Sequence, residues 1–289
     1  MSKEKHYNII KFSKDFIARR NAADYYVLYV SKGDEEEIFD LLRNEDDSSV
    51  YIPLINALGR MGSEKALDYL IANLNHKRFD QYCLGNIQLY WNEKALKTIA
   101  DVILNNKKEL MRDRALQICE KIGVTNFTDV LIEAFKREKV GYIQSKIIAL
   151  LGKTKSEKAI EVMRQILLNS KNRIDRHDAI TSLFNIGTDR AYQVMTTGLS
   201  DEDHYVVQSA EAYLGGCKSP NIVNYLEPIL KNPKLELRNS IVKILGNIKS
   251  KKALELLLFV ANNDSNPSLR VKANSLAQDL EAALNQGQK

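Results

Sequence analysis

Ser63-Glu64-Lys65-Ala66 is the most informative stretch of the sequence, because close relatives of it recur further along the chain. It returns as Asn92-Glu93-Lys94-Ala95, as Ser156-Glu157-Lys158-Ala159 and, more loosely, as Ser250-Lys251-Lys252-Ala253. In each copy a small polar residue stands where its side chain accepts from the free amides of a first helical turn. An early Glu, where it is present, complements the helix dipole. Each copy therefore predicts the start of a helix.

Apolar residues follow these starts with the period of a one-sided helix. After Ser156, for example, they fall at i, i+3, i+4, i+7 and i+8. These positions are Ala159, Val162, Met163, Ile166 and Leu167. The same spacing follows the other copies, so each predicts an amphipathic helix with one buried face.

A further helix is expected before each of these, and one position in it repeats at steps of 30 to 32 residues. Two antiparallel helices cannot cover their own apolar faces, so neighbouring pairs must stack. The sequence therefore predicts an all-α fold, an α-solenoid (superhelix) of about eight antiparallel helix pairs plus a C-terminal capping helix. The repeated positions are Arg20, Tyr51, Tyr82, Arg112, Gln144, Arg176, Val207, Arg238 and Arg270.

No long linker interrupts the repeats, so residues 1–289 are expected to form a single domain. Within it we expect an N-terminal basic capping helix over 1–19, stacked repeats over 20–265, a final capping helix over 266–284 and a disordered tail over 285–289. The 44% of apolar residues and the low count of 13 Gly and 5 Pro exclude a disordered or collagen-like chain.

Compartment and redox state follow from what the sequence lacks. The start Met1–His6 leads into no apolar signal core, and the richest apolar run, Leu254–Ala261, is far too short to span a bilayer. We therefore expect a cytoplasmic protein without a membrane partner. The three cysteines have no CxxC spacing, which predicts buried free thiols and no metal site. They are Cys83, Cys119 and Cys217.

The net charge of +5 is small for 289 residues. Its basic residues are spread along the chain, apart from a basic start over residues 1–20. A nucleic-acid interface normally gathers Lys and Arg on one face, so nucleic acid is kept only as a third interpretation.

The 31-residue unit resembles the short HEAT-type repeat named after phycobilisome lyases. The resemblance rests on Arg at the repeated position, on Leu-Gly at the end of the first helix and on the Ser/Asn-Glu-Lys-Ala start. That family includes bilin lyase subunits, adaptor-like proteins and scaffolds. Tyr51, Tyr82, Gln144 and Val207 replace the expected Arg. The Asp/Arg ladder between repeats that the resemblance implies is therefore expected to be incomplete.

No catalytic motif is visible, and we expect no catalytic residue and no cofactor. The fold also resembles that of the deoxyhypusine hydroxylases, in which several His-Glu pairs hold iron. This chain has no His-Glu pair, so no metal is expected. Its four histidines are His6, His76, His177 and His204.

These observations predict a non-enzymatic scaffold or adaptor that holds a partner protein in the concave groove of the solenoid. A bilin lyase subunit or bilin chaperone is the alternative, in which aromatic side chains contact a tetrapyrrole. The candidate anchor is an unusually short turn that carries the only Trp of the chain. The candidate binding residues are Tyr82, Tyr90 and Trp91 around that turn, and Asn73, Lys97, Arg164 and Gln193 on the second helices.

Overall fold

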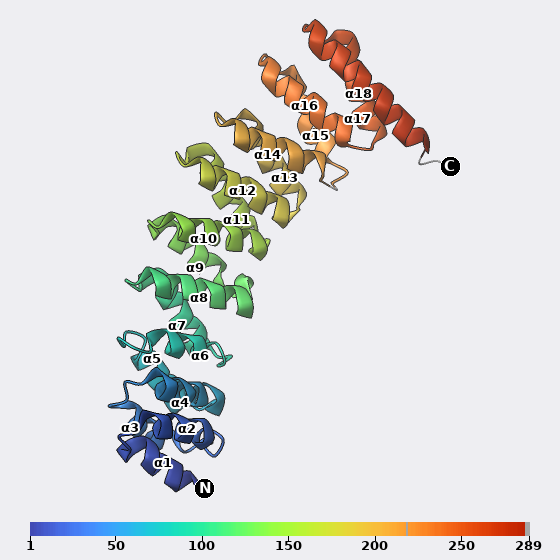
Figure 1. Cartoon of the computed structure of the whole chain (residues 1–289). Coiled ribbons are helices and arrows are strands. Elements are labelled where there is room, and N and C mark those ends of the chain that lie inside the picture. The colour runs from blue at the N-terminus through green and yellow to red at the C-terminus, as the bar shows by residue number, and fades with distance from the viewer. Residues whose placement is uncertain (218, 287–289) are drawn as a thin grey trace. The chain divides into compact units, whose positions relative to one another are not determined.

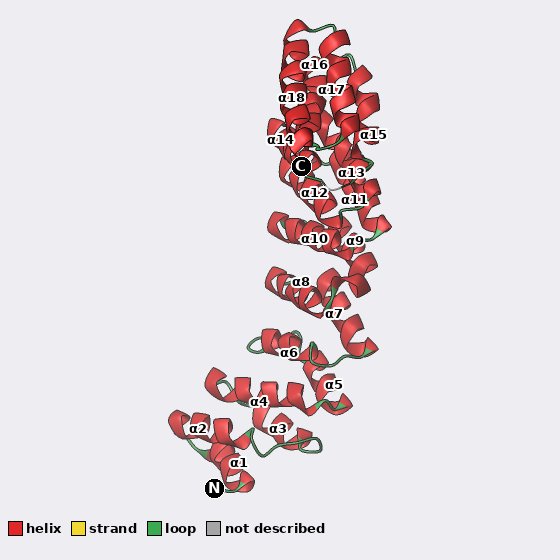
Figure 2. Ribbon diagram, turned by 90° about the vertical axis from the view of Figure 1, so that its right-hand side faces the viewer, coloured by secondary structure: helices red, strands yellow, loops and turns green. Residues whose placement is uncertain are grey.

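A computed structural model describes residues 1–217 and 219–286 of the chain (Figure 1). Within these residues the structure contains 18 α-helices, three short 3₁₀ helices and no strand (Figure 2). The predicted all-α solenoid of paired helices is thus confirmed. The helices gather into two compact units, Met1–Gly123 and Val124–Lys289. The predicted single domain over residues 1–289 stays a prediction.

Unit 1 consists of an N-terminal helix followed by helix pairs in which first and second helices form separate layers (Figure 2). The first helices α2, α4, α6 and α8 pack against one another in sequence, and α3 and α5 contact each other in the second layer. The helices are α1 (Lys3–Phe12), α2 (Phe16–Tyr26), α3 (Glu35–Leu42), α4 (Ser48–Met61), α5 (Glu64–Ala72), α6 (Asp80–Ile87), α7 (Glu93–Asn105) and α8 (Glu109–Ile122).

Unit 2 repeats this two-layer arrangement and closes with one long helix. Each of the first helices α10, α12, α14, α16 and α18 packs on the next, while α9, α11, α13 and α15 follow one another in the second layer. The α-helices are α9 (Thr128–Arg137), α10 (Gly141–Thr154), α11 (Glu157–Asn169), α12 (Arg173–Ile186), α13 (Asp189–Met195), α14 (His204–Gly215), α15 (Ile222–Leu226), α16 (Leu235–Asn247), α17 (Lys251–Asn263) and α18 (Pro267–Gln286). The 3₁₀ helices are η1 (Val124–Phe127), η2 (Thr196–Ser200) and η3 (Glu227–Lys231).

The recurring four-residue stretch caps its helix with its first residue and buries its alanine. Its first residue caps the helix: the Ser63 hydroxyl accepts from the Ala66 amide at 3.1 Å. Its alanine is fully buried in all four copies, at Ala66, Ala95, Ala159 and Ala253. These two roles explain why the stretch favours a small polar residue first and a small apolar residue fourth.

The lysine of the stretch connects each second helix to the preceding repeat. Lys65 pairs with Glu36 of α3 at 2.6 Å, Lys158 with Asp129 of α9 at 2.7 Å, and Lys252 with Glu227 of η3 at 2.9 Å. Surface pairs of this kind contribute about 0–1 kcal/mol each. The lysines therefore help to set the register of stacking more than its strength.

A second ladder starts from the repeated Arg position. The guanidinium of Arg176 donates to the Ser170 carbonyl at 2.9 Å and forms a two-bond ion pair with Asp201 of the next repeat. Arg238 does the same with the Asn232 carbonyl and with Asp264.

Where another residue replaces Arg, the ladder of hydrogen bonds is incomplete, as the sequence predicts. Gln144 still donates to the Glu138 carbonyl at 2.8 Å. Tyr51 donates instead to the Arg78 carbonyl at 3.2 Å. At the N-terminus Arg19, and not Arg20, makes the equivalent bond, to the Ser13 carbonyl.

Two details differ from the sequence prediction. The basic start over residues 1–19 forms α1 and the beginning of α2, because Asp15 caps a new helix by accepting from the Ile17 amide. The predicted tail over 285–289 begins inside α18, and its last three residues, 287–289, lie outside the described residues.

Candidate functional site

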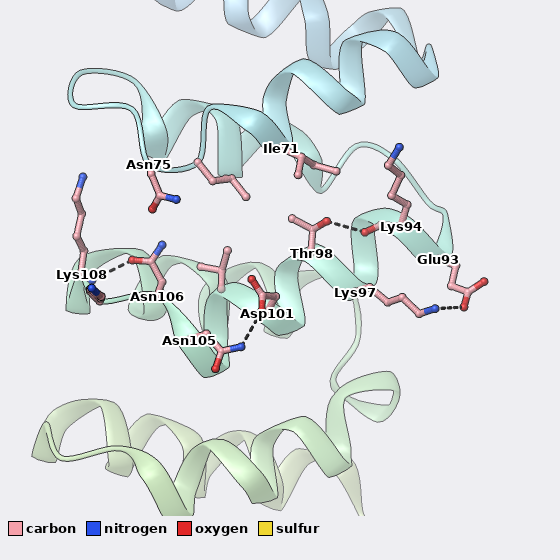
Figure 3. A pocket seen from close by; sticks show the side chains of 13 residues that line it. Ile71, Asn75, Glu93, Lys94, Lys97, Thr98, Asp101, Asn105, Asn106 and Lys108 are labelled. Atoms are coloured by element: carbon pink, nitrogen blue, oxygen red, sulfur yellow. Dashed lines mark hydrogen bonds and ion pairs between the residues drawn. The ribbon is translucent and has the colours of Figure 1, made fainter.

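A cavity of about 1040 Å³ lies between α5 and α7 in unit 1 (Figure 3). Its lining combines apolar side chains, four lysines, two acids and several amide or hydroxyl groups. The lining residues are Ile71, Leu74, Asn75, Glu93, Lys94, Lys97, Thr98, Asp101, Val102, Asn105, Asn106, Lys107 and Lys108. Most of them belong to α7 or to the turn that follows it.

The two helices that border the cavity, α5 and α7, differ in length. Helix α5 has 9 residues and α7 has 13, which makes α7 longer by about 6 Å. Helix α5 ends at Ala72, where the Asn73 side chain donates to the Tyr69 carbonyl at 2.8 Å. The last turn of α7 therefore extends past the end of its neighbour.

Ion pairs hold three of the four lysines. Lys97 pairs with Glu93 on its own helix at 2.6 Å, and Lys108 pairs with the buried Asp80 at 2.5 Å. Lys94 reaches across to α5, where it pairs with Asp68 and lies 3.7 Å from Glu64. The hydrogen bond to Asp68 raises the pKa of Lys94, so this lysine stays charged at neutral pH.

Lys107 differs from the other lysines of the lining. Within the described part of the chain its ammonium group has neither an ion-pair nor a hydrogen-bond partner. Lys97 is also accessible, with a side chain that is 75% exposed. Neither of these two lysines has a buried ion-pair partner among the described residues. Each can therefore bind an anion that enters the cavity without breaking a buried ion pair.

The floor of the cavity is apolar, and its walls carry polar groups. Leu74 and Val102 are buried, and Ile71 is half-buried. On the wall formed by α7, Asn105 donates to Asp101 at 2.7 Å and the Thr98 hydroxyl donates to the Lys94 carbonyl at 2.8 Å (Figure 3). A ligand with apolar surface and anionic groups would match this lining.

The predicted aromatic anchor divides into two different environments. The Tyr90 side chain is buried, and its hydroxyl donates to the Leu58 carbonyl at 2.6 Å, so it fills the space left by the short turn. Trp91 is 73% exposed and is free to contact a ligand. Tyr82 is 37% exposed on α6, with its ring edge toward Tyr51.

The other predicted binding residues do not form one site. Lys97 lines the cavity, while Asn73 serves as the cap of α5. Arg164 pairs with Glu161 at 2.7 Å and Gln193 accepts from Arg190 at 2.9 Å, both on second helices of unit 2.

No cluster of potential metal ligands is present among residues 1–217 and 219–286: no group of three or more His, Cys, Asp and Glu side chains is arranged to hold an ion. The histidines make other contacts. His76 stacks on Phe79 with ring centroids 3.5 Å apart, and His177 stacks on Tyr205 at 4.8 Å.

Family comparisons agree with the repeats seen in the structure. Residues 128–215 match the family model for HEAT repeats, and residues 54–76 match that for PBS lyase HEAT-like repeats. The resemblance to HEAT-type repeats is thereby confirmed. The second match includes all of α5 and, of the cavity floor, Ile71 and Leu74.

A curated relative corrects the predicted function. Deoxyhypusine hydroxylase of Drosophila pseudoobscura pseudoobscura is 24% identical over 230 residues, which cover 69% of this chain and 74% of that protein. That relative is an enzyme, so the comparison points to an enzyme family. The predictions of a non-enzymatic scaffold and of a chain that is not an enzyme were therefore wrong.

Two solved structures are similar over nearly their whole length. Human deoxyhypusine hydroxylase in complex with glycerol shares 16% identity, with 96% of this chain and 95% of that chain covered and a TM-score of 0.36. The complex of CpcE and CpcF of phycocyanin lyase from Nostoc sp. PCC7120 shares 15% identity, with 97% and 95% covered and a TM-score of 0.37.

The iron chemistry of the hydroxylase does not fit the side chains of this chain. The resemblance to these hydroxylases implies an iron site built from several His-Glu pairs, and the sequence contains no His-Glu neighbours. The described residues also bring no three potential ligands together.

None of the described helices is both long enough and apolar enough to cross a bilayer.

Proposed function

We propose that the chain is a bilin lyase subunit or bilin chaperone, and that the cavity between α5 and α7 holds a linear tetrapyrrole. The observation that carries the proposal is the lining of this cavity. It combines accessible lysines with an apolar floor, next to the segment that matches PBS lyase HEAT-like repeats.

The size of the cavity supports a ligand of this class. Small-molecule sites usually measure about 300–1,000 Å³, and the volume here is about 1040 Å³. A linear tetrapyrrole offers flat apolar rings, which suit the surface formed by Ile71, Leu74 and Val102.

The charges support the same ligand. A linear tetrapyrrole carries two propionate groups. Lys107 and the exposed Lys97, whose partner Glu93 is also exposed, are the cations of the lining that can receive them. Each new ion pair at such an accessible site contributes about 0–1 kcal/mol, so Lys97 and Lys107 supply only part of the affinity.

Trp91 makes the proposal directly testable, because it is the only Trp of the chain and lies two residues before Glu93 of the cavity wall. Titration with biliverdin is expected to quench its fluorescence by energy transfer, with saturation at one ligand per chain. The double variant Lys97→Glu/Lys107→Glu is expected to weaken binding at least about 10-fold, since it places two negative charges against the propionates.

Lys251→Glu is the matched control, because it reverses an exposed lysine on α17 of unit 2. It should leave the titration unchanged. Linear quenching without saturation, or equal affinity in both variants, would contradict the proposal. Coexpression with bilin synthesis gives a second test: a coloured protein is expected, and a colourless one would count against a bilin carrier.

A further inference from the structure

One stripe of exposed side chains on α2 is complementary to itself. Phe16, Arg20, Asp24 and Leu28 follow one another at intervals of four residues, which places them on one side of the helix and the turn after it. The order is apolar, basic, acidic, apolar. All four are exposed, Phe16 by 60% and Leu28 by 74%.

The charged side chains of the stripe lack ion-pair partners within the described part of the chain, although Arg20 helps to lower the pKa of Asp47. Neither Arg20 nor Asp24 forms an ion pair or a side-chain hydrogen bond with another described residue. The buried side of α2 is different, with Ala22, Ala23 and Tyr26 directed into unit 1. The exposed stripe is therefore not needed to hold the first repeat together.

Further apolar side chains widen this surface. Phe12 is 69% exposed, Ile17 54% and Tyr25 58%, all on α1 and α2 at the beginning of the repeats. Exposed apolar side chains that lie together in one region are uncommon on a soluble monomer. An apolar surface in this place points to a partner that covers it.

We propose that this face pairs with the same face of a second copy of the chain, to form a two-fold symmetric dimer. In this dimer the two α2 helices lie antiparallel, and the two-fold axis passes between them at the level of Ala22. Two residues then lie opposite each other when their numbers add to 44. Phe16 then meets Leu28 of the second copy, and Arg20 meets Asp24. The pairs occur twice because the interface is isologous.

The charge pattern favours a second copy of the chain as the partner. In the antiparallel arrangement each Arg20 faces an Asp24, whereas a parallel arrangement would place like charges side by side. The stripe is about 18 Å long, and the flanking Phe12, Ile17 and Tyr25 are available to extend it toward the area that stable dimers bury.

Sedimentation of the full chain and of charge-reversed variants tests the proposal. The wild type is expected to sediment as a dimer with twice the 32.9 kDa chain mass. Arg20→Asp alone and Asp24→Arg alone should each raise the dissociation constant at least about 10-fold, because like charges then face each other twice. An equimolar mixture of the two variants should dimerise again, since every Asp then faces an Arg.

Recovery in the mixture is the decisive result, because variants that failed to fold could not produce it. Ile174→Asp on α12 is the control for a general effect of removing exposed apolar surface, and it should leave the dimer intact. A wild type that is monomeric at every concentration overturns the proposal. So does a dimer that both single charge reversals leave unchanged.

Discussion

Replacing Arg176 by Met tests the ladder that joins consecutive repeats. The guanidinium is 6% exposed and the Asp201 carboxylate 4% exposed, and they meet through bonds of 2.7 Å and 2.9 Å. Met keeps the length of the side chain but leaves the carboxylate buried without a cation. Removal of one partner from a buried pair costs about 3–5 kcal/mol, so the free energy of unfolding is expected to fall by that amount.

Urea unfolding followed by far-ultraviolet circular dichroism measures this change through the transition midpoint. The double variant Arg176→Met/Asp201→Asn should recover about 2 kcal/mol, because no unpaired charge is then left buried. Lys243→Met is the matched control: Lys243 is 42% exposed in its pair with Glu211 at 3.0 Å, and loss of this pair should cost about 1 kcal/mol or less. If Arg176→Met and Lys243→Met lowered the free energy of unfolding equally, the claim that burial makes the Arg176–Asp201 pair more important would be refuted.

Two more predictions concern stability. Gly152→Ala should destabilise the chain by about 1–3 kcal/mol, because its new Cβ would lie 3.0 Å from the Ser182 Cα, whereas Gly141→Ala on the same helix meets open space and should not destabilise it. Thermal unfolding of both variants decides this, and equal losses would contradict it. The hydrogen bonds from Arg238 lower the pKa of Asp264. The stability that this carboxylate adds is present above its unfolded pKa of about 3.9 and is lost as the pH falls toward the folded pKa. In Asp264→Asn the free energy of unfolding should therefore decrease less steeply below about pH 4 than in the wild type. An unchanged slope would contradict the stabilising role of the Arg238–Asp264 pair.

The repeats were predictable because their signals are local. A cap such as Ser63 and a buried alanine such as Ala66 act within one helical turn, and the sequence shows both directly. The thinner ladder at Gln144 and Tyr51 was equally visible, since it depends on which side chain occupies one repeated position.

The cavity was not predictable from the same signals. The apolar pattern of α5 continues to Leu74, but the helix stops at Ala72, where the Asn73 side chain donates to a carbonyl of the last turn. The aromatic pair was misleading for a similar reason. Sequence spacing does not reveal that Tyr90 turns inward to Leu58 while Trp91 remains exposed.

The functional prediction failed for a different reason. Helical periodicity reports stacking and carries no information about chemistry. The resemblance to deoxyhypusine hydroxylases was visible in the repeats, but the lack of His-Glu pairs was given more weight. The alignment with such an enzyme over 230 residues at 24% identity overturns that choice.

A crystal structure of the full chain with biliverdin tests the proposed site most directly. The account predicts density for one tetrapyrrole between α5 and α7, with its propionates near Lys97 and Lys107 and its rings over Leu74 and Val102. An empty cavity at saturating biliverdin, or a tetrapyrrole bound elsewhere on the chain, would contradict it.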